Sequence, residues 1–247
     1  MISVVVPTKG ASKDLEKCLQ SLKRQKCETI IVDSTQETKE IAKRYGTRWV
    51  EDKLNTIGNA YAVGAEAASG DIIAFIDSDA FAPGAWIEAL NREIKKERLD
   101  VLGGNDVLPK DSTPFEEAAY QIDLARKEKQ LYGREAAMRL RATNIAFTRQ
   151  ALKRIKFNRQ LKGLQEPELL HRMHKAGYKI KFEPRIIVYH RRRNSLRGIF
   201  RQIYRNGKGK VVLIKMHKEM ISPIDILPLI FIAVLGMRFE SLAALPP

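Results

Sequence analysis

The sequence contains few cysteines. Only Cys18 and Cys27 occur among its 247 residues, and they do not have the Cys-x-x-Cys spacing of a metal motif. Two cysteines cannot supply the disulfide framework of a small secreted domain, so the sequence predicts a reducing compartment. It contains no internal repeat or low-complexity tract, and its length suits one domain with an appendage.

Long apolar runs are also missing. A helix needs about 20 consecutive apolar residues to cross a bilayer, whereas the run over 226–237 has twelve and is interrupted by Pro228. We expect this run to lie in the membrane interface or to begin a truncated span. The chain leads from Met1 directly into the apolar run 2–6. No signal peptide is therefore predicted, and the catalytic part is expected in the cytoplasm.

Acidic residues are in the minority. The 29 Asp and Glu residues face 44 Lys and Arg residues, which gives a formal charge of +15. Such a charge predicts a polyanionic partner, for example nucleic acid, anionic lipid or a phosphorylated substrate. The segment 185–218 contributes eleven basic residues and no acidic ones.

Part of this basic segment has the pattern of an amphipathic helix. Arg197, Arg201 and Arg205 form one stripe at i, i+4 spacing. A second, apolar stripe consists of Leu196, Ile199, Phe200, Ile203 and Tyr204. A helix of this kind lies on an anionic membrane surface. Nucleic acid is not the expected partner, because the segment lacks the interleaved aromatic residues and motifs of nucleic-acid-binding modules.

Apolar runs alternate with helical patterns in the first half of the chain. The predicted strands are 2–6, 29–32, 47–50 and the run that follows Asp71. The predicted helices begin at Ser12, at Ser34 with a Ser-x-x-Glu capping box over 34–37, and at Gly58. This order predicts an α/β fold with a Rossmann-like, mostly parallel sheet flanked by helices. Ligands of such sheets bind beyond the carboxyl ends of the strands.

The later segments continue this alternation. Helices are predicted over 114–132 and 164–176, the second with Pro167 in its first turn. Two short strands, 178–183 and 186–190, are predicted on either side of Pro184. The chain is expected to end in the amphipathic, interfacial helices described above.

The stretch from Asp71 to Asp79 carries the clearest chemical signal. An apolar run is followed by Asp77-Ser78-Asp79, with Ser69-Gly70 before the stretch and Pro83-Gly84 after it. This pattern predicts a buried strand that ends in a loop at the sheet edge. Two carboxylates at i, i+2 can bind one hard cation and leave its other positions to water and phosphate oxygens. A metal–diphosphate is the natural ligand, and a plain acidic turn is the alternative.

Several motifs recur in one order along residues 1–210. They are Pro7-Thr8, Asp33, Gly58 with Ala60, Asp77-Ser78-Asp79, Glu166-Pro167-Glu168-Leu169, His190 and Gln202-Ile203-Tyr204-Arg205. On these motifs the sequence resembles family 2 glycosyltransferases of the GT-A fold, of the membrane-associated type that builds polyprenyl- or dolichyl-linked glycans. The resemblance implies transfer of a sugar from a nucleotide donor.

The resemblance also implies a metal site and a general base. Asp79 is expected to bind Mn²⁺ or Mg²⁺ directly, Asp77 to lie nearer the ribose or the ion's water ligands, and His190 to complete the site. Glu166 matches the position of the family's catalytic aspartate, and Glu168 is the alternative base. The alternative to a catalytic role is an acidic helix start favoured by the helix dipole.

The donor-binding residues follow from the same resemblance. Asp33 is expected to accept a hydrogen bond from a ring N–H of uracil or guanine. The other expected donor contacts are Pro7, Thr8, Lys9, Gly58, Asp77, Ser78, Gln202 and Arg205. Gln202 to Arg205 fit the first four positions of the Gln-x-x-Arg-Trp motif of processive synthases, but Asn206 replaces the tryptophan. Addition of a single sugar is therefore favoured.

These observations predict an inverting, metal-dependent hexosyltransferase at the cytoplasmic side of the cell membrane. The donor is expected to be GDP- or UDP-linked, with GDP-mannose as the first choice. The acceptor is expected to be a lipid-linked glycan or a polyprenyl phosphate. Residues 1–192 would form the catalytic domain, and 193–247 the basic helix and apolar tail. Two alternatives stay open, a nucleic-acid-binding protein and a sugar nucleotidyltransferase.

Overall fold

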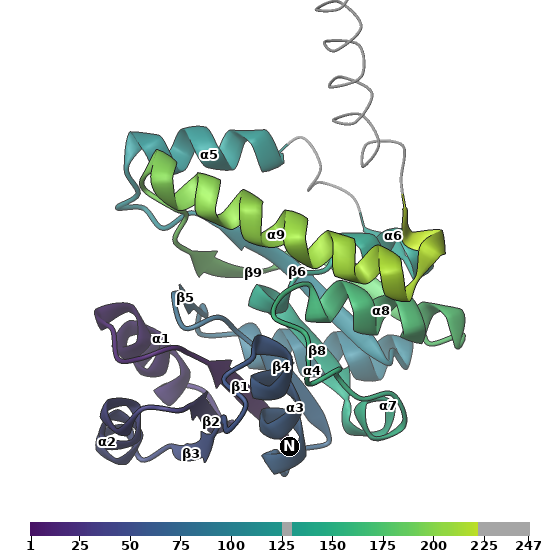
Figure 1. Ribbon diagram of the computed structural model, residues 1–247. Helices are drawn as coiled ribbons and strands as arrows, with labels where there is room; N and C mark the ends of the chain where they lie inside the picture. The colour runs from purple at the N-terminus through teal and green to yellow at the C-terminus, as the bar shows by residue number, and fades with distance from the viewer. Residues whose placement is uncertain (125–129, 222–247) are drawn as a thin grey trace, which may run out of the picture. The chain divides into compact units, whose positions relative to one another are not determined.

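The computed structural model describes residues 1–124 and 130–221 (Figure 1). The chain divides into two compact units, Met1–Asn206 and Gly207–Pro247. The expected division into a catalytic domain, 1–192, and a membrane-associating region, 193–247, stays a prediction. The apolar run 226–237 lies outside the described residues.

A nine-stranded sheet forms the centre of the first unit (Figure 1). The strand order is β3-β2-β1-β4-β8-β6-β9-β5, and β7 pairs with β9. The strands are β1 (Ile2–Pro7), β2 (Glu28–Asp33), β3 (Arg48–Glu51), β4 (Ile72–Phe75), β5 (Ala80–Phe81), β6 (Val101–Val107), β7 (Leu131–Tyr132), β8 (Ile145–Thr148) and β9 (Ile180–His190).

The described α-helices are α1 (Lys13–Lys23), α2 (Gln36–Tyr45), α3 (Ile57–Ala67), α4 (Trp86–Glu97), α5 (Pro114–Leu124), α6 (Gly133–Arg139), α7 (Arg149–Arg154), α8 (Gln165–Lys175) and α9 (Leu196–Met216). Two short 3₁₀ turns, η1 (Ala142–Asn144) and η2 (Lys218–Met220), complete the described elements. The predicted helix over 164–176 corresponds to α8. The predicted helix over 114–132 is wrong at its end, because residues 131–132 form β7.

The α/β fold is confirmed, and six of the nine strands of the mixed sheet run in one direction, as predicted. The strands β3, β2, β1 and β4 pair in parallel. By contrast, β8 runs antiparallel to β4 and β6, and β9 is parallel to β6 but antiparallel to β5 and β7. The antiparallel direction of β8 arises because this strand enters directly from η1 instead of from a crossover helix.

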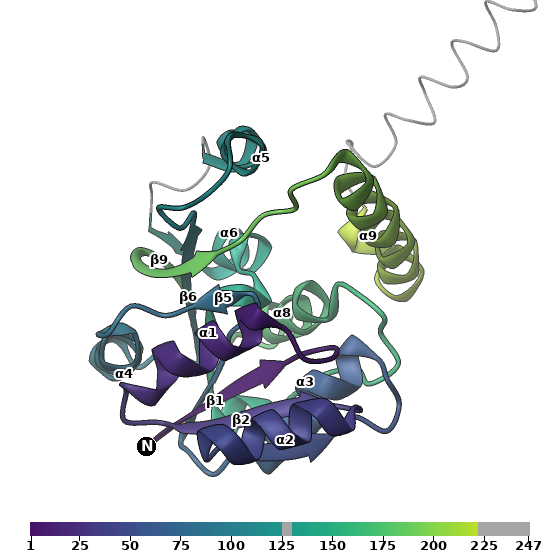
Figure 2. The same cartoon turned by 90° about the vertical axis from the view of Figure 1, so that its left-hand side faces the viewer.

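Helices cover both faces of the sheet because side chains alternate along each strand. Val4 and Val6 of β1 pack in a core cluster with α1, α2 and α4, whereas Val5 packs in a cluster with α3, α6, α7 and α8. Figure 2 shows α1 and α2 in front of β1 and β2. Strands that are buried on both faces read as nearly continuous apolar runs, which is why the sequence revealed them.

The predicted capping box at Ser34 does not form. Thr35 is the N-cap of α2 and makes no side-chain cap bond. Instead, the hydroxyls of Thr35 and Thr38 donate to the Asp33 carboxylate at 2.6 and 2.9 Å. Asp33 is only 3% exposed, and a buried carboxylate needs hydrogen-bond donors more than an exposed helix end does. The local pattern is therefore overridden by burial.

One strand replaces the two that were predicted around Pro184. β9 is continuous from Ile180 to His190, and its pairing with β6 shifts register after Gly104. A Cβ at Gly104 would lie 1.9 Å from the Ile186 carbonyl oxygen, so a glycine is required for this close approach. The register shift accommodates the proline, and the unbroken strand delivers His190 to the sheet edge.

A buried ionic cluster lies on β9. Lys181 is 1% exposed, and its Nζ contacts Glu97 at 2.5 Å, Glu93 at 3.3 Å and Glu183 at 3.4 Å. Hydrogen bonds to Glu97 and Glu93 raise the pKa of Lys181 above its ordinary range, although burial opposes the shift. Hydrogen bonds from Arg185 lower the pKa of Glu183 to about 2. The cluster ties α4 to β9 through charged groups that satisfy one another.

The basic amphipathic helix is present as α9. Its first residues belong to the first unit, where four apolar side chains are between 61 and 70% exposed. These are Leu196, Phe200, Ile203 and Tyr204. Within residues 1–124 and 130–221, the helices are too short or too polar to cross a bilayer.

Candidate active site

Asp77 and Asp79 lie beyond the carboxyl end of β4, as the sequence predicted. Ile76 N–H still donates to the β1 backbone at Val5, and the chain then turns into the short strand β5. β5 pairs antiparallel with β9, with Ala80 opposite His190. This pairing places the histidine beside Asp79, because Ala80 is the next residue along the chain.

The structure brings Asp77, Asp79 and His190 together. One ligand atom from each lies within 4.8 Å of the other two. His190 Nε2 is 3.2 Å from Asp79 Oδ1. Two carboxylates and an imidazole form a donor set that suits Mn²⁺, and the carboxylates with water also suit Mg²⁺. The residues therefore fit the predicted divalent ion.

Asp77 is held by two hydroxyl groups that the sequence analysis did not identify. Tyr61 Oη donates to Asp77 Oδ1 at 3.3 Å, and Thr143 Oγ1 donates to Oδ2 at 2.7 Å. Tyr61 is itself fixed by stacking on Phe75, with ring centroids 4.8 Å apart. Burial raises the pKa of Asp77, and the negative charge of Asp79 adds to the shift. Both Asp77 oxygens are thus engaged, which leaves Asp79 as the more accessible ligand.

His190 lies between two carboxylates. Asp106 Oδ2, from β6, is 3.4 Å from His190 Nδ1, on the side of the ring opposite Asp79. Although burial opposes the shift, hydrogen bonds to Asp106 and Asp79 raise the pKa of His190 to about 9. A carboxylate on the far nitrogen is the usual device that orients a metal-binding imidazole. Asp106 is therefore a positioning residue for His190.

The structure distinguishes the two candidate bases. Glu168 is 1% exposed, and its two carboxylate oxygens accept from Arg172 Nε and Nη2, each at 2.7 Å. Glu166 is less buried and lies near Asp77. Burial raises the pKa of Glu166, with the charge of Asp77 as a smaller contribution and that of Arg141 opposing. Glu168 therefore has a structural partner, and the role of Glu166 as the general base stays a prediction.

The predicted nucleoside contacts gather at the ends of β1 and β2. Thr8 N–H donates to Val32 O at 3.0 Å, and Gly10 N–H donates to Asp33 Oδ2 at 3.1 Å. Together with the two threonine hydroxyls, three donors converge on this one oxygen. Pro7 ends β1, and Lys9 is exposed on the loop. Asp33 therefore shapes the loop that would contact the nucleoside, and its role in base recognition stays a prediction.

Gly58 has a packing role that the sequence did not reveal. Its N–H donates to Leu161 O at 2.9 Å, and a Cβ there would lie 2.2 Å from the backbone oxygen of Asn158. Its backbone is thus occupied by the loop before α8. The contacts of Gly58 do not support the predicted donor binding.

The remaining predicted donor residues are less constrained. Ser78 is half-buried between the two aspartates. Gln202 and Arg205 are exposed on α9, and no hydrogen bond or ion pair joins either to the described residues of the site. Their contact with a donor stays a prediction.

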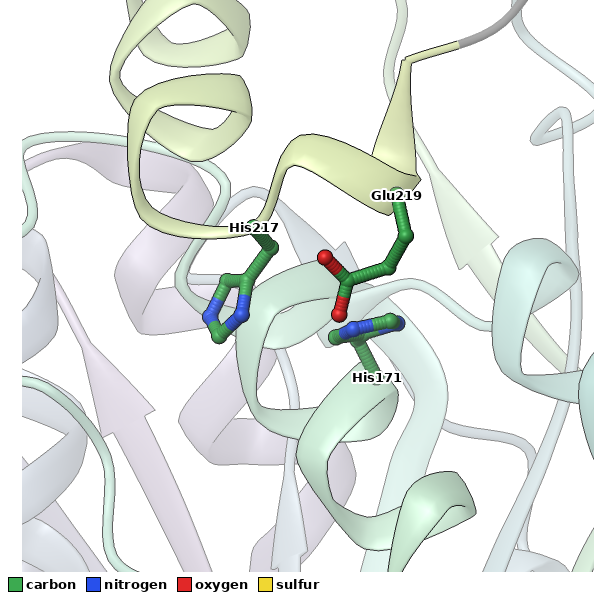
Figure 3. Close-up of side chains that lie close together, drawn as sticks. All are labelled: His171, His217 and Glu219. Atoms are coloured by element: carbon green, nitrogen blue, oxygen red, sulfur yellow. The ribbon is translucent and has the colours of Figure 1, made fainter.

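A second group of candidate ligands is shown in Figure 3. His171 is on α8 in the first unit, whereas His217 and Glu219 lie after α9 and in η2, in the second unit. Neither unit alone contains all three side chains. The group therefore defines no metal site within either unit.

A mixed α/β sheet whose strands end at two aspartates and a histidine is the arrangement of nucleotide-sugar transferases with the GT-A fold. The family model for glycosyl transferase family 2 matches residues 3–156, more than half of the chain. The chain belongs to this family.

The curated relatives are also glycosyltransferases. The chain is 31% identical to glycosyltransferase AglE of Haloferax volcanii over 117 residues, which are 42% of this chain and 38% of that protein. It is 30% identical to the uncharacterized glycosyltransferase EpsJ of Bacillus subtilis over 113 residues, 42% of this chain and 33% of that protein. The matched part therefore spans only 38% and 33% of the length of these two relatives.

Solved structures support the fold. The mannosyltransferase PcManGT of Pyrobaculum calidifontis, in complex with GDP-Man and Mn²⁺, superposes with a TM-score of 0.67 at 17% identity, over 92% of this chain and 67% of that one. TarS of S. aureus, in complex with UDP-GlcNAc, gives 0.64 at 21% identity, over 78% of this chain and 59% of that one. At these identities the likeness establishes the GT-A fold alone.

Proposed function

We propose that this glycosyltransferase is inverting and metal-dependent. It moves a single hexose from a nucleotide diphosphate sugar to a polyprenyl phosphate or lipid-linked glycan. The observation that carries the proposal is the grouping of Asp77, Asp79 and His190, with Glu166 near enough to Asp77 for that charge to act on its carboxyl. A site for the leaving diphosphate and a base for the acceptor are the two requirements of a direct displacement at the anomeric carbon.

The chemistry follows from these positions. The ion, when bound, neutralises charge on the departing diphosphate. Glu166 removes the proton from an attacking sugar hydroxyl as the new bond forms on the face opposite the leaving group. The attacking oxygen of a phosphate acceptor is already ionised at neutral pH and needs no base. One displacement inverts the anomeric centre. The raised pKa of Glu166 makes it a better proton acceptor than an exposed carboxylate.

Two structurally similar glycosyltransferases were solved with different nucleotide sugars. PcManGT was solved with GDP-Man and Mn²⁺, and TarS with UDP-GlcNAc. We propose mannose from GDP-mannose, because PcManGT superposes over the larger share of this chain. Asp33 would accept a hydrogen bond from either guanine or uracil.

Nucleotide titration tests the proposed function. The protein is expected to bind GDP more tightly than UDP when Mn²⁺ is present, and to bind neither appreciably when the metal is chelated. Isothermal calorimetry measures both affinities, and release of nucleoside diphosphate rather than pyrophosphate from the sugar nucleotide distinguishes transfer from nucleotidyl transfer. Absence of binding to both nucleotides at every metal concentration would contradict the proposal.

We also propose that α9 binds the cytoplasmic face of an anionic membrane. Its exposed apolar side chains, among them Phe200 and Ile203, and its arginines suit the interface between acyl chains and anionic headgroups. Each cation near such a surface contributes about 1 kcal/mol. The same field would attract a lipid phosphate acceptor.

Vesicle co-sedimentation tests the membrane proposal. Removing two cations in Arg197→Gln/Arg201→Gln is expected to weaken binding to phosphatidylserine vesicles about 30-fold. The matched control Lys95→Gln/Lys96→Gln removes the same charge from the end of α4 and should have less than a threefold effect. Equal losses in both variants would indicate nonspecific attraction. Tight, salt-sensitive binding to duplex DNA without vesicle binding would favour the nucleic-acid alternative.

A further inference from the structure

Three consecutive arginines follow His190, and they have different partners. Arg191 pairs with Asp111 and, through Nη1, with Glu116 Oε2 at 3.4 Å. Its N–H also donates to the Asp79 carbonyl at 3.4 Å. These contacts fasten the segment that leaves β9 to the loop before α5.

Arg192 is a second anchor. Its Nη2 lies 2.5 Å from Asp106 Oδ2, and its backbone N–H donates to Glu116 Oε1 at 3.2 Å. Its guanidinium also lies over the ring of Tyr120, with 5.5 Å to the centroid. Arg192 therefore holds the same Asp106 that orients His190, and its side chain is committed to the protein.

Arg193 differs from both. Its one recorded ion pair among the described residues is with Asp79, where Nη1 is 3.8 Å from Oδ2. The side chain is 50% exposed, against 22% for Arg191 and 19% for Arg192. The two anchored neighbours thus fix the backbone beside the site while the third guanidinium stays accessible.

A divalent ion changes the electrostatics at Asp79. Its two positive charges would neutralise the carboxylate and repel a guanidinium a few ångströms away. The donor diphosphate would bring negative charge close to Asp79 and so offer the displaced arginine a new anionic partner. The planar fork of arginine matches two phosphate oxygens at once.

We propose that Arg193 binds the donor's diphosphate and stabilises the charge that develops on the leaving nucleoside diphosphate. This inference rests on the proposed function. It gives the chain a diphosphate contact beside the metal site, independent of Arg205 on α9. The pairing with Asp79 in the ligand-free protein is exchanged for phosphate when the metal–nucleotide binds.

The test compares nucleotides that differ by one phosphate. In the full chain with Mn²⁺, Arg193→Ala is expected to weaken GDP or UDP binding about 10- to 100-fold, and GMP or UMP binding less than threefold. Arg193→Lys should recover part of the diphosphate affinity, because it keeps the charge but not the fork. Binding of Mn²⁺ alone should be unchanged or slightly tighter, since a competing cation has left Asp79.

A matched control lies at the opposite edge of the sheet. Arg154→Ala removes an exposed arginine from the last turn of α7. This helix follows the end of β8, which pairs with the start of β4 and therefore lies away from Asp77 and Asp79. The variant should bind the nucleoside mono- and diphosphates with wild-type affinity. Equal losses of mono- and diphosphate binding in Arg193→Ala, or no loss at all, would overturn the inference while wild-type binding upholds the proposed function. If the wild type binds no nucleotide diphosphate, the proposed function fails and the inference falls with it.

Discussion

Asp79→Asn is expected to abolish metal-dependent nucleotide binding. Loss of the accessible carboxylate should reduce affinity for Mn²⁺ by more than about 100-fold, a larger effect than loss of a partner that only orients a ligand. Binding of the nucleoside diphosphate should fall with it, because Asp77, Asp79 and His190 would hold the ion that neutralises the charge of the phosphates. Calorimetric titration of Mn²⁺ alone, and then of the nucleotide at saturating Mn²⁺, measures the two effects separately.

The same variant should also change the pKa of His190. Asp79 is one of the three carboxylates, with Asp106 and Asp77, that raise the pKa of His190 to about 9, so this pKa should fall toward its ordinary value in Asp79→Asn. Imidazole resonances followed by NMR across the pH range report this change without any ligand present. Asp106 still contacts the ring in the variant, so a partial fall is expected.

The control for Asp79→Asn is at the other end of the same strand. Asp71 precedes β4, its side chain is 87% exposed, and it forms an ion pair with the amino terminus. Asp71→Asn should therefore bind metal and nucleotide as the wild type does. If Asp79→Asn instead kept the metal dependence of the wild type, the ion would have to be bound elsewhere.

Glu166→Gln is expected to lower the rate of sugar transfer by about 10²- to 10⁴-fold while donor affinity stays within twofold. Glutamine keeps the shape of the side chain but cannot take the acceptor proton. Single-turnover transfer with a saturating donor measures the chemical step, and the nucleotide titration confirms that the donor site is intact.

The pH profile gives an independent signature of the base. The folded pKa of Glu166 is raised, and the base works only when deprotonated. Activity of the wild type should therefore fall as pH drops through that raised pKa, at a higher pH than an ordinary glutamate would give. This acidic limb should be absent from the residual activity of Glu166→Gln.

Glu168→Gln is the informative comparison. Glu168 is buried in a bidentate pair with Arg172, so its loss should lower the free energy of unfolding by about 1–3 kcal/mol. Transfer by the folded fraction should remain near wild type. A large rate loss in Glu168→Gln with no rate loss in Glu166→Gln would reverse the assignment of the base.

The sequence was most informative where a local pattern coincided with burial. β1, β2 and β4 are buried on both faces, so each could be predicted from a continuous apolar run in the sequence. These runs end at Pro7, Asp33 and Asp77. Parallel neighbours end at one sheet edge, which was sufficient to group Asp77 and Asp79 with the first loops. The helix α9 could also be predicted, because the residues on one face of an amphipathic helix recur at a fixed spacing.

Other features depended on contacts between residues far apart in the chain. Tyr61 and Thr143 reach Asp77 from 16 and 66 residues away, and Asp106 reaches His190 from 84 residues away. Such partners are fixed by the strand order, in which β8, β6 and β9 follow β4. That order has no local sequence signal, so the supports of the site could not be predicted.

By itself, the sequence determined the strand–helix alternation, the two aspartates after a buried strand, the histidine before the arginines and the basic helix. These depend on side-chain periodicity and turn residues, which act over a few positions. The tertiary structure decided that Glu168 pairs with Arg172 and that Gly58 packs against a loop. It also decided that, of the three arginines after His190, Arg193 is the one whose side chain pairs with Asp79. Each of these roles depends on which charged or backbone groups the folded chain brings within a few ångströms, and only packing determines that.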